Sequence, residues 1–176
     1  MAGFWNRVNR LLRHAWVDES DLHQAIPLAV LNRLQELISA SELEHSGEIR
    51  VCVEASLPWR MLWRDTPITD IIRERALSVF SELGVWDTDN NNGVLIYVLL
   101  AEKDIEIVAD RGLNVHVPPE HWQVLIGQMG LAFKDGQFEK GLTQGVDAVT
   151  MSLLKHFCAD QTRVNPNELP DWPLLR

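Results

Sequence analysis

The sequence predicts an α/β fold in which a small mixed sheet carries helices on both faces. Three observations lead to this prediction. An alternating segment at 48–55 and a continuous apolar segment at 94–100 are typical of strands, and a helical pattern lies between them. A crossover through a helix makes those two strands parallel, with a right-handed connection. A third alternating segment at 104–110 follows a short turn, which predicts an antiparallel hairpin.

The first segment of the chain, residues 3–16, has the spacing of a basic amphipathic helix. Arg7, Arg10 and Arg13 lie opposite the apolar side chains, and residues 1–17 contain no acid. Two interpretations are open. The helix docks on its own domain, or it binds an acidic membrane surface or a membrane-associated protein. The apolar face consists of Phe4, Trp5, Val8, Leu11, Leu12, Ala15 and Trp16.

Two further helices are expected before the second strand. Residues 20–43 predict a long helix that either begins with Pro27 in its first turn or kinks there. The next helix should follow Thr66 as its N-cap, with Pro67 at the first helical position and Gly84 as the C-terminal cap.

The segment 56–65 is interpreted as a loop, although it holds Trp59, Met61, Leu62 and Trp63. A loop with so many large apolar side chains either folds back onto the body or forms the lip of a binding surface.

The rest of the chain predicts two helices and a tail. One helix begins at 117–120, and a long one covers 138–157. The last residues hold three prolines and no periodicity, which is typical of an extended tail. The predicted organisation is an N-terminal helix within 1–17, a domain at 18–159 and the tail at 160–176.

Composition restricts the class of protein. The net charge is −9, so the main body lacks the basic face that nucleic acid requires. Two cysteines without close spacing predict free thiols and no cysteine-based zinc site. There is no apolar leader and no apolar segment of about 20 residues, which predicts a cytoplasmic protein.

The candidate site lies where the loop 87–92 enters the second strand. This loop has six consecutive oxygen-bearing side chains. The third strand returns antiparallel, so Asp110 and Arg111 should lie beside the loop, and Glu48 should begin at the same edge. Two interpretations are open: a cation or phosphate-type site, or an Asx-rich turn that bonds its own backbone. The side chains that should gather at this edge, as candidate oxygen ligands for Ca²⁺ or Mg²⁺, are Asp87, Asp89, Asn90, Asn91, Asn92 and Asp110.

Other motifs are weaker. The loop is not an EF-hand, because Gly93 comes one place late and Val98 stands where a bidentate glutamate is needed. His116 and His121 are interpreted as features of a loop and a helix start rather than as a zinc site. Serines and histidines are too scattered to indicate a nucleophile and its base.

The motif Asn-Asn-Gly-Val-Leu at 91–95, with the hairpin after it, resembles the TPM domain family. The resemblance covers roughly residues 25–155 and implies an α/β/α three-layer sandwich. A plant member has been described as an acid phosphatase, and some members bind calcium at an acidic rim. The family usually has Gly-Tyr-Gly-Leu where this chain has Asp-Arg-Gly-Leu at 110–113, which either adds a ligand or neutralises the rim with an Asp–Arg pair. Most members are exported or membrane-anchored, so this chain resembles a short cytoplasmic bacterial form.

Two functions are therefore considered. The favoured one is a cation-binding interaction or scaffold module that residues 3–16 dock to the inner face of a membrane or to a membrane-associated protein. The alternative is a metal-assisted phosphomonoester hydrolase. In that case a cation on Asp87, Asp89 and Asp110 would polarise phosphate and activate water, and Arg111 would neutralise the developing charge, which makes Asp110 and Arg111 the catalytic candidates.

Overall fold

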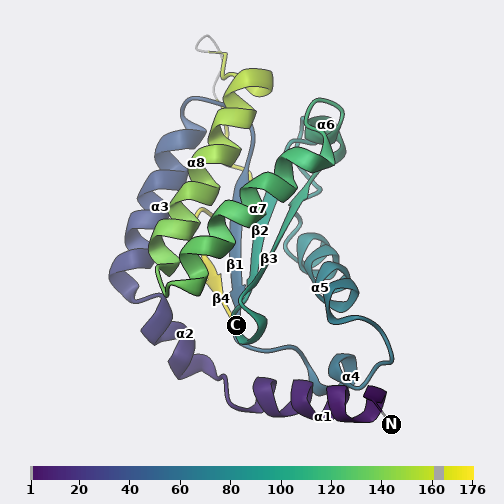
Figure 1. Ribbon diagram of the computed structural model, residues 1–176. Helices are drawn as coiled ribbons and strands as arrows, with labels where there is room; N and C mark the ends of the chain where they lie inside the picture. Colours follow the sequence, from purple (N-terminus) through teal and green to yellow (C-terminus); the bar gives the residue numbers. More distant parts are fainter. Residues whose placement is uncertain (1, 161–164) are drawn as a thin grey trace.

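The computed structural model describes residues 2–160 and 165–176 and has helices on both faces of a mixed sheet (Figure 1). The strand order is β3-β2-β1-β4. β1 runs parallel to β2, and β3 pairs antiparallel with β2, so the predicted crossover and hairpin are both confirmed. The strands are β1 (Ile49–Glu54), β2 (Val94–Leu99), β3 (Asp104–Ala109) and β4 (Leu174–Leu175).

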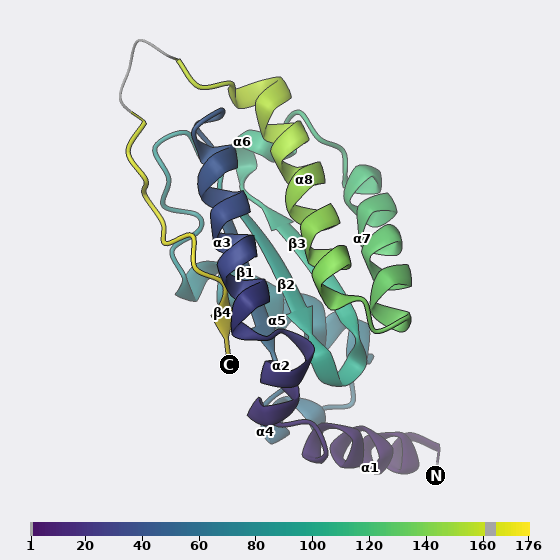
Figure 2. The same cartoon turned by 90° about the vertical axis from the view of Figure 1, so that its left-hand side faces the viewer.

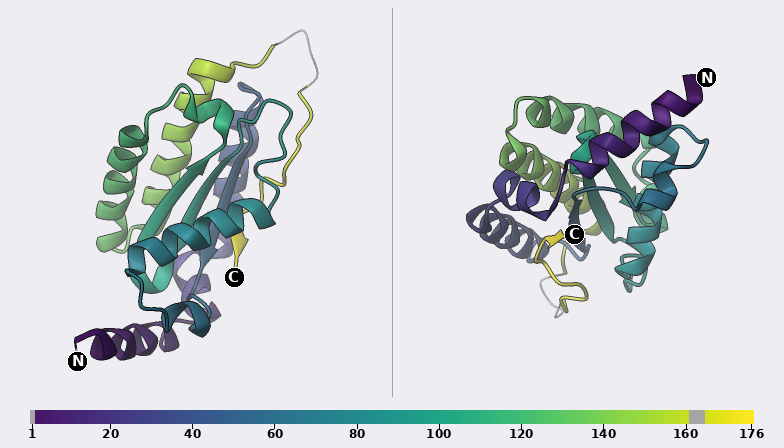
Figure 3. Two further views of the ribbon diagram at one scale, coloured as in Figure 1. Left: turned by 90° about the vertical axis from the view of Figure 1, so that its right-hand side faces the viewer. Right: turned by 90° about the horizontal axis from the view of Figure 1, so that it is seen from below.

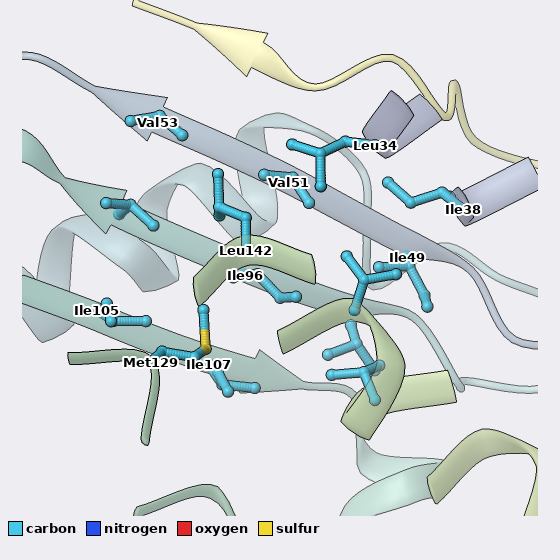
Figure 4. Packing of buried hydrophobic residues seen from close by; sticks show 14 of the residues in the cluster. Leu34, Ile38, Ile49, Val51, Val53, Ile96, Ile105, Ile107, Met129 and Leu142 are labelled. Carbon is cyan, nitrogen blue, oxygen red and sulfur yellow. The ribbon is translucent and has the colours of Figure 1, made fainter. Parts of the chain in front are cut away.

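Strand β2 is buried on both faces because its apolar side chains alternate between two cores. Val94, Ile96 and Val98 face the larger core, where Met129 and Leu142 approach the sheet (Figure 4). Three helices lie side by side over this face (Figure 2): α3 (Leu28–Glu42), α7 (Pro119–Lys134) and α8 (Phe138–Phe157).

The opposite face of the sheet is covered by α5 (Ile68–Glu82), as the left view of Figure 3 shows. Leu95, Tyr97 and Leu99 point into this second core. The two cores on either side of one sheet confirm the three-layer sandwich.

The N-terminal helices differ from the expected pattern in one place. The chain forms α1 (Ala2–Ala15), then α2 (Glu19–Ala25), and it breaks at Pro27 before α3 begins. Pro27 has ψ 159°, an extended backbone that neither helix can continue through. Of the two alternatives for residues 20–43, the interruption at Pro27 agrees better with the structure, and it divides the expected helix completely into α2 and α3.

The start of α5 was predicted one residue too early. Pro67 has ψ 141° and is itself the N-cap residue, so the helix begins at Ile68 and Thr66 does not cap it. Gly84 has φ +67° after the last turn, as a C-terminal cap requires. The expected loop at 56–65 contains a short helix, α4 (Trp59–Leu62), and a 3₁₀ turn (Leu100–Glu102) lies between β2 and β3.

The described part of the C-terminal tail is extended and lies against the domain. β4 pairs with β1, and the Ala55 N–H donates to the Arg176 carbonyl at 2.7 Å. The carboxylate of Glu48 accepts from the backbone N–H groups of Glu168 and Leu169 at 3.2 and 3.1 Å. Glu48 directly precedes β1 at the edge where β2 starts, as predicted, since the Val94 N–H donates to the Glu48 carbonyl at 2.8 Å, and its side chain holds the tail. Residues 161–164 of this segment are outside the described residues.

Two titratable side chains are buried near this edge of the sheet. Glu42 accepts from the Ile49 N–H at 2.9 Å through Oε1, and burial raises the pKa of Glu42 to about 9. His45 is completely buried, and burial lowers its pKa to about 4. Both side chains are therefore uncharged in the folded protein at neutral pH.

We expect the Glu42→Gln variant to lose part of the pH dependence of stability. Between pH 4.5 and about 9 the folded state holds a proton on Glu42 that the unfolded state has released, so the unfolding free energy falls as pH rises. Glutamine removes that proton linkage and flattens the fall.

Urea unfolding at several pH values from 5 to 9 measures this slope. His45 acts in the opposite direction, because its lowered pKa destabilises the fold as pH falls from 6.5 towards about 4, and it does so in both proteins. Equal slopes in wild type and variant would contradict the assignment of Glu42.

Candidate functional site

The loop between α5 and β2 is anchored by Asn92, which is completely buried. Its backbone N–H donates to Thr88 Oγ1 at 3.1 Å, and Thr88 Oγ1 donates to Asn92 Oδ1 at 3.3 Å. The Asn92 amide nitrogen donates to the Ser46 carbonyl at 3.0 Å, which ties the loop to the segment before β1. The predicted ligand Asn92 is therefore engaged in holding the loop.

Two close approaches join the loop to the sheet. A Cβ atom on Gly93 would lie 2.1 Å from the Val85 carbonyl oxygen. A Cβ on Gly112 would lie 2.5 Å from the Asn91 carbonyl oxygen, to which the Gly112 N–H donates at 2.8 Å. Asn91 has φ +52°, so the chain turns sharply there. The end of β3 and the loop before β2 thus lie together, as the topology predicts.

Asp110 is the N-cap residue of α6 (Arg111–Asn114). Its Oδ1 accepts from the Arg111 N–H at 2.7 Å, while Oδ2 is buried and has no hydrogen-bond partner. The Arg111 side chain turns to the loop, where Nε donates to Asn91 Oδ1 at 2.8 Å. No ion pair joins the side chains of Asp110 and Arg111 within the part of the chain that the structure describes. We use the term rim for the loop 87–92 together with Asp110 and Arg111.

Asp87 and Asp89 are exposed residues of the loop. The Asp89 backbone N–H donates to Glu168 at 3.0 Å, and a cavity of about 330 Å³ lies between this part of the loop and the tail. Glu168 and Asp160 also line that cavity. The sequence pattern does not indicate these two residues, because both are far from the loop along the chain. Among residues 2–160 and 165–176, no three His, Cys, Asp or Glu side chains are placed to hold a metal ion.

Three of the six histidines, His116, His121 and His156, line a separate cavity of about 470 Å³ between the start of α7 and the end of α8. His116 stacks on His156 with ring centroids 4.7 Å apart, and His121 Nε2 lies 3.3 Å from Ser152 Oγ. Ser152 donates to the Ala148 carbonyl at 3.0 Å, so its hydroxyl proton is bonded within the helix. Only the tertiary structure brings these residues together, because helical spacing along α8 gives no indication of the contact with α7.

The geometry defines an α/β/α sandwich with an oxygen-rich loop at the entry to its central strand. The BA42 protein from the psychrophilic bacterium Bizionia argentinensis has a similar structure, with a TM-score of 0.72, 29% identity, and coverage of 86% of this chain and 95% of that one. The N-terminal domain of a protein from P. gingivalis has a TM-score of 0.57 at 23% identity, covering 76% of this chain and 82% of that one. A comparison with curated protein sequences found no match.

A comparison of the sequence with protein-family models identifies the family of this chain. The family model described as the TPM domain matches residues 20–152, so the chain belongs to the TPM domain family.

Replacing Gly93 by alanine should destabilise the fold by about 2 kcal/mol or more, because the Cβ would collide with the Val85 backbone. The matched control is Gly127→Ala in α7, where a Cβ meets nothing within 4 Å. That change should leave stability equal or raise it by about 0.5–1 kcal/mol through helix propensity. Urea unfolding of the two variants measures the difference, and equal stabilities would show that the close approach is not required.

Proposed function

We propose that this TPM-domain protein is an interaction module that binds a divalent cation, Ca²⁺ or Mg²⁺, at the rim. The observation that supports the proposal is the buried Oδ2 atom of Asp110, which has no hydrogen-bond partner in the described structure. A buried polar atom without a partner costs about 1–3 kcal/mol, and more when it is charged. A bound cation would remove that cost.

The donor chemistry around Asp110 suits a hard cation. The backbone carbonyl oxygens of Asn90 and Asn91 approach Gly112 closely, and carbonyl oxygens accept more than one partner. Asp87 and Asp89 add exposed carboxylates on the same loop.

The candidate ligands have unequal roles in this proposal. Asn92 supports the loop, and Asn91 Oδ1 is bound to Arg111, so the carboxylates of Asp87, Asp89 and Asp110 come first. In the described structure these three carboxylates are not placed to hold one metal ion together. The proposal therefore requires the exposed loop to close on the ion, which costs free energy and makes the affinity modest.

Calcium or magnesium should raise the melting temperature of the wild type, and Asp110→Asn should abolish the response. Asparagine keeps the shape and the Oδ1 acceptor but removes the charge. Stabilisation of about 2.7 kcal/mol is expected at a cation concentration 100 times the Kd. Asp147→Asn is the matched control, since Asp147 is exposed on α8 and outside the rim, and it should respond as the wild type does.

Amide NMR shifts locate the effect, which should fall in residues 87–93 and 110–112. If neither the amide shifts nor the melting temperature changes at about 10 mM of either ion, the loop is an Asx-rich turn and not a cation site. This concentration exceeds the dissociation constants of the weakest calcium sites in proteins.

A hydrolase is the second candidate, and one observation favours it. The Arg111 guanidinium bonds an amide oxygen rather than a carboxylate, so its positive charge is not neutralised by an ion pair in the described part of the chain. Such a guanidinium suits phosphate oxygens. A cation on Asp87, Asp89 and Asp110 would polarise the phosphate and activate water.

We expect the wild type to hydrolyse p-nitrophenyl phosphate with Mg²⁺ or Ca²⁺ no faster than the Asp89→Ala/Asp110→Ala variant. An interaction module needs neither nucleophile nor general acid, and the one Ser–His contact described, His121 with Ser152, lies outside the rim. A wild-type rate at least about tenfold above that of the double variant would favour the hydrolase, since removing groups that bind a transition state costs this much or more.

A further inference from the structure

Helix α1 exposes an apolar face of its own. Trp5 and Leu12 lie on one side of α1, seven residues apart, and Trp16 directly follows the last residue of the helix. Their exposed fractions are 63%, 54% and 82%. The short helix α4 packs against α1 and exposes Trp59 and Trp63 at 66% and 47%. We call these five side chains the tryptophan platform.

Helix α1 docks through Leu11, which packs against the second core, and through polar side chains. Arg7 pairs with Asp65 at 2.7 Å, and Arg10 donates to the Thr66 carbonyl at 3.3 Å. His14 is buried, and its Nδ1 accepts from the Leu57 N–H at 3.0 Å.

A second set of contacts lies at the turn after β2. Arg13 pairs with Glu102, and His14 Nε2 lies 3.2 Å from the same carboxylate. Docking therefore buries only part of the apolar face: Leu11 contacts the second core, whereas Trp5, Leu12 and Trp16 stay exposed. The Phe4 side chain, part of the predicted apolar face, is outside the described residues.

The charge of this region is opposite to that of the body. Residues 2–17 and 56–65 contain five arginines and one aspartate. Glu102 and Glu74 pair with two of these arginines, Arg13 and Arg64, so the region with these partners has a net charge of +2. The whole chain is −9, so the remainder carries −11. Figure 3 shows in its right view that α1 extends across the lower end of the molecule, and Figure 1 places α6 and the rim at the other end.

We propose that the tryptophan platform docks on a lipid bilayer that contains anionic lipid. Tryptophan rings favour the membrane–water interface, where the ring is buried and its N–H meets headgroups. The +2 region is attracted to the anionic surface while the −11 body is repelled, which orients the rim away from the membrane. A second copy of the chain is a poorer occupant, because it would bring two positively charged regions together.

The docking is peripheral. No helix among the described residues is long and apolar enough to cross a membrane. The inference rests on the proposed role as an interaction module, but it does not depend on a cation at the rim. Vesicle binding measured in EDTA therefore separates the two proposals.

The test is co-sedimentation of the full chain with phosphatidylcholine vesicles, with and without phosphatidylglycerol, in EDTA. The wild type should bind the anionic vesicles, with a blue shift of tryptophan emission, and binding should weaken with salt. The Trp16→Ala/Trp59→Ala variant should lose about tenfold or more in partition coefficient, since it removes two large interfacial side chains.

The matched control is Trp86→Ala/Leu131→Ala, which removes two apolar side chains of 52% and 65% exposure outside the platform. It should bind as the wild type does, and circular dichroism checks that both variants fold. No binding by the wild type, equal loss in the control, or equal binding to vesicles without anionic lipid would each overturn the proposal. A dimer seen by light scattering and lost in Trp16→Ala/Trp59→Ala, without vesicle binding, would instead assign the platform to a second copy.

Discussion

The burial of β2 on both faces is the constraint on which the rest of this structure depends. All six of its residues are completely buried, so one strand joins the core under α3, α7 and α8 to the core under α5. The one polar side chain of β2 is satisfied inside the second core, where the Tyr97 hydroxyl donates to Glu54 at 2.7 Å and Glu54 pairs with Arg75 at 2.9 Å. The residue before β2 is restricted to glycine, because Gly93 passes so close to the Val85 carbonyl that a side chain would not fit.

The direction of the strands then separates two candidate surfaces. β3 runs back beside β2, which brings Asp110 to the loop 87–92 at the entry of β2. β1 and β2 both lead to the other end, where Leu57 and Glu102 hold the polar side of α1. The proposed docking surface and the proposed cation site therefore lie at opposite ends of the molecule (Figure 1).

The edge of the sheet beside β1 is closed by the chain itself. An unpaired strand edge is a site for unwanted association, and β4 covers it over Cys52 and Val53. The Glu48 carboxylate accepts two backbone N–H groups from the tail and so fastens the C-terminal segment.

The sequence by itself determined the layers, the parallel crossover, the hairpin and the meeting of Asp110 with the loop, because periodicity and connection length reflect local backbone physics. It did not determine which oxygens are occupied: Asn92 bonds Ser46, and Arg111 bonds Asn91 rather than Asp110. It also left open which side of α1 docks. Only the tertiary structure decided these points, because each depends on a partner more than ten residues away that local pattern does not encode.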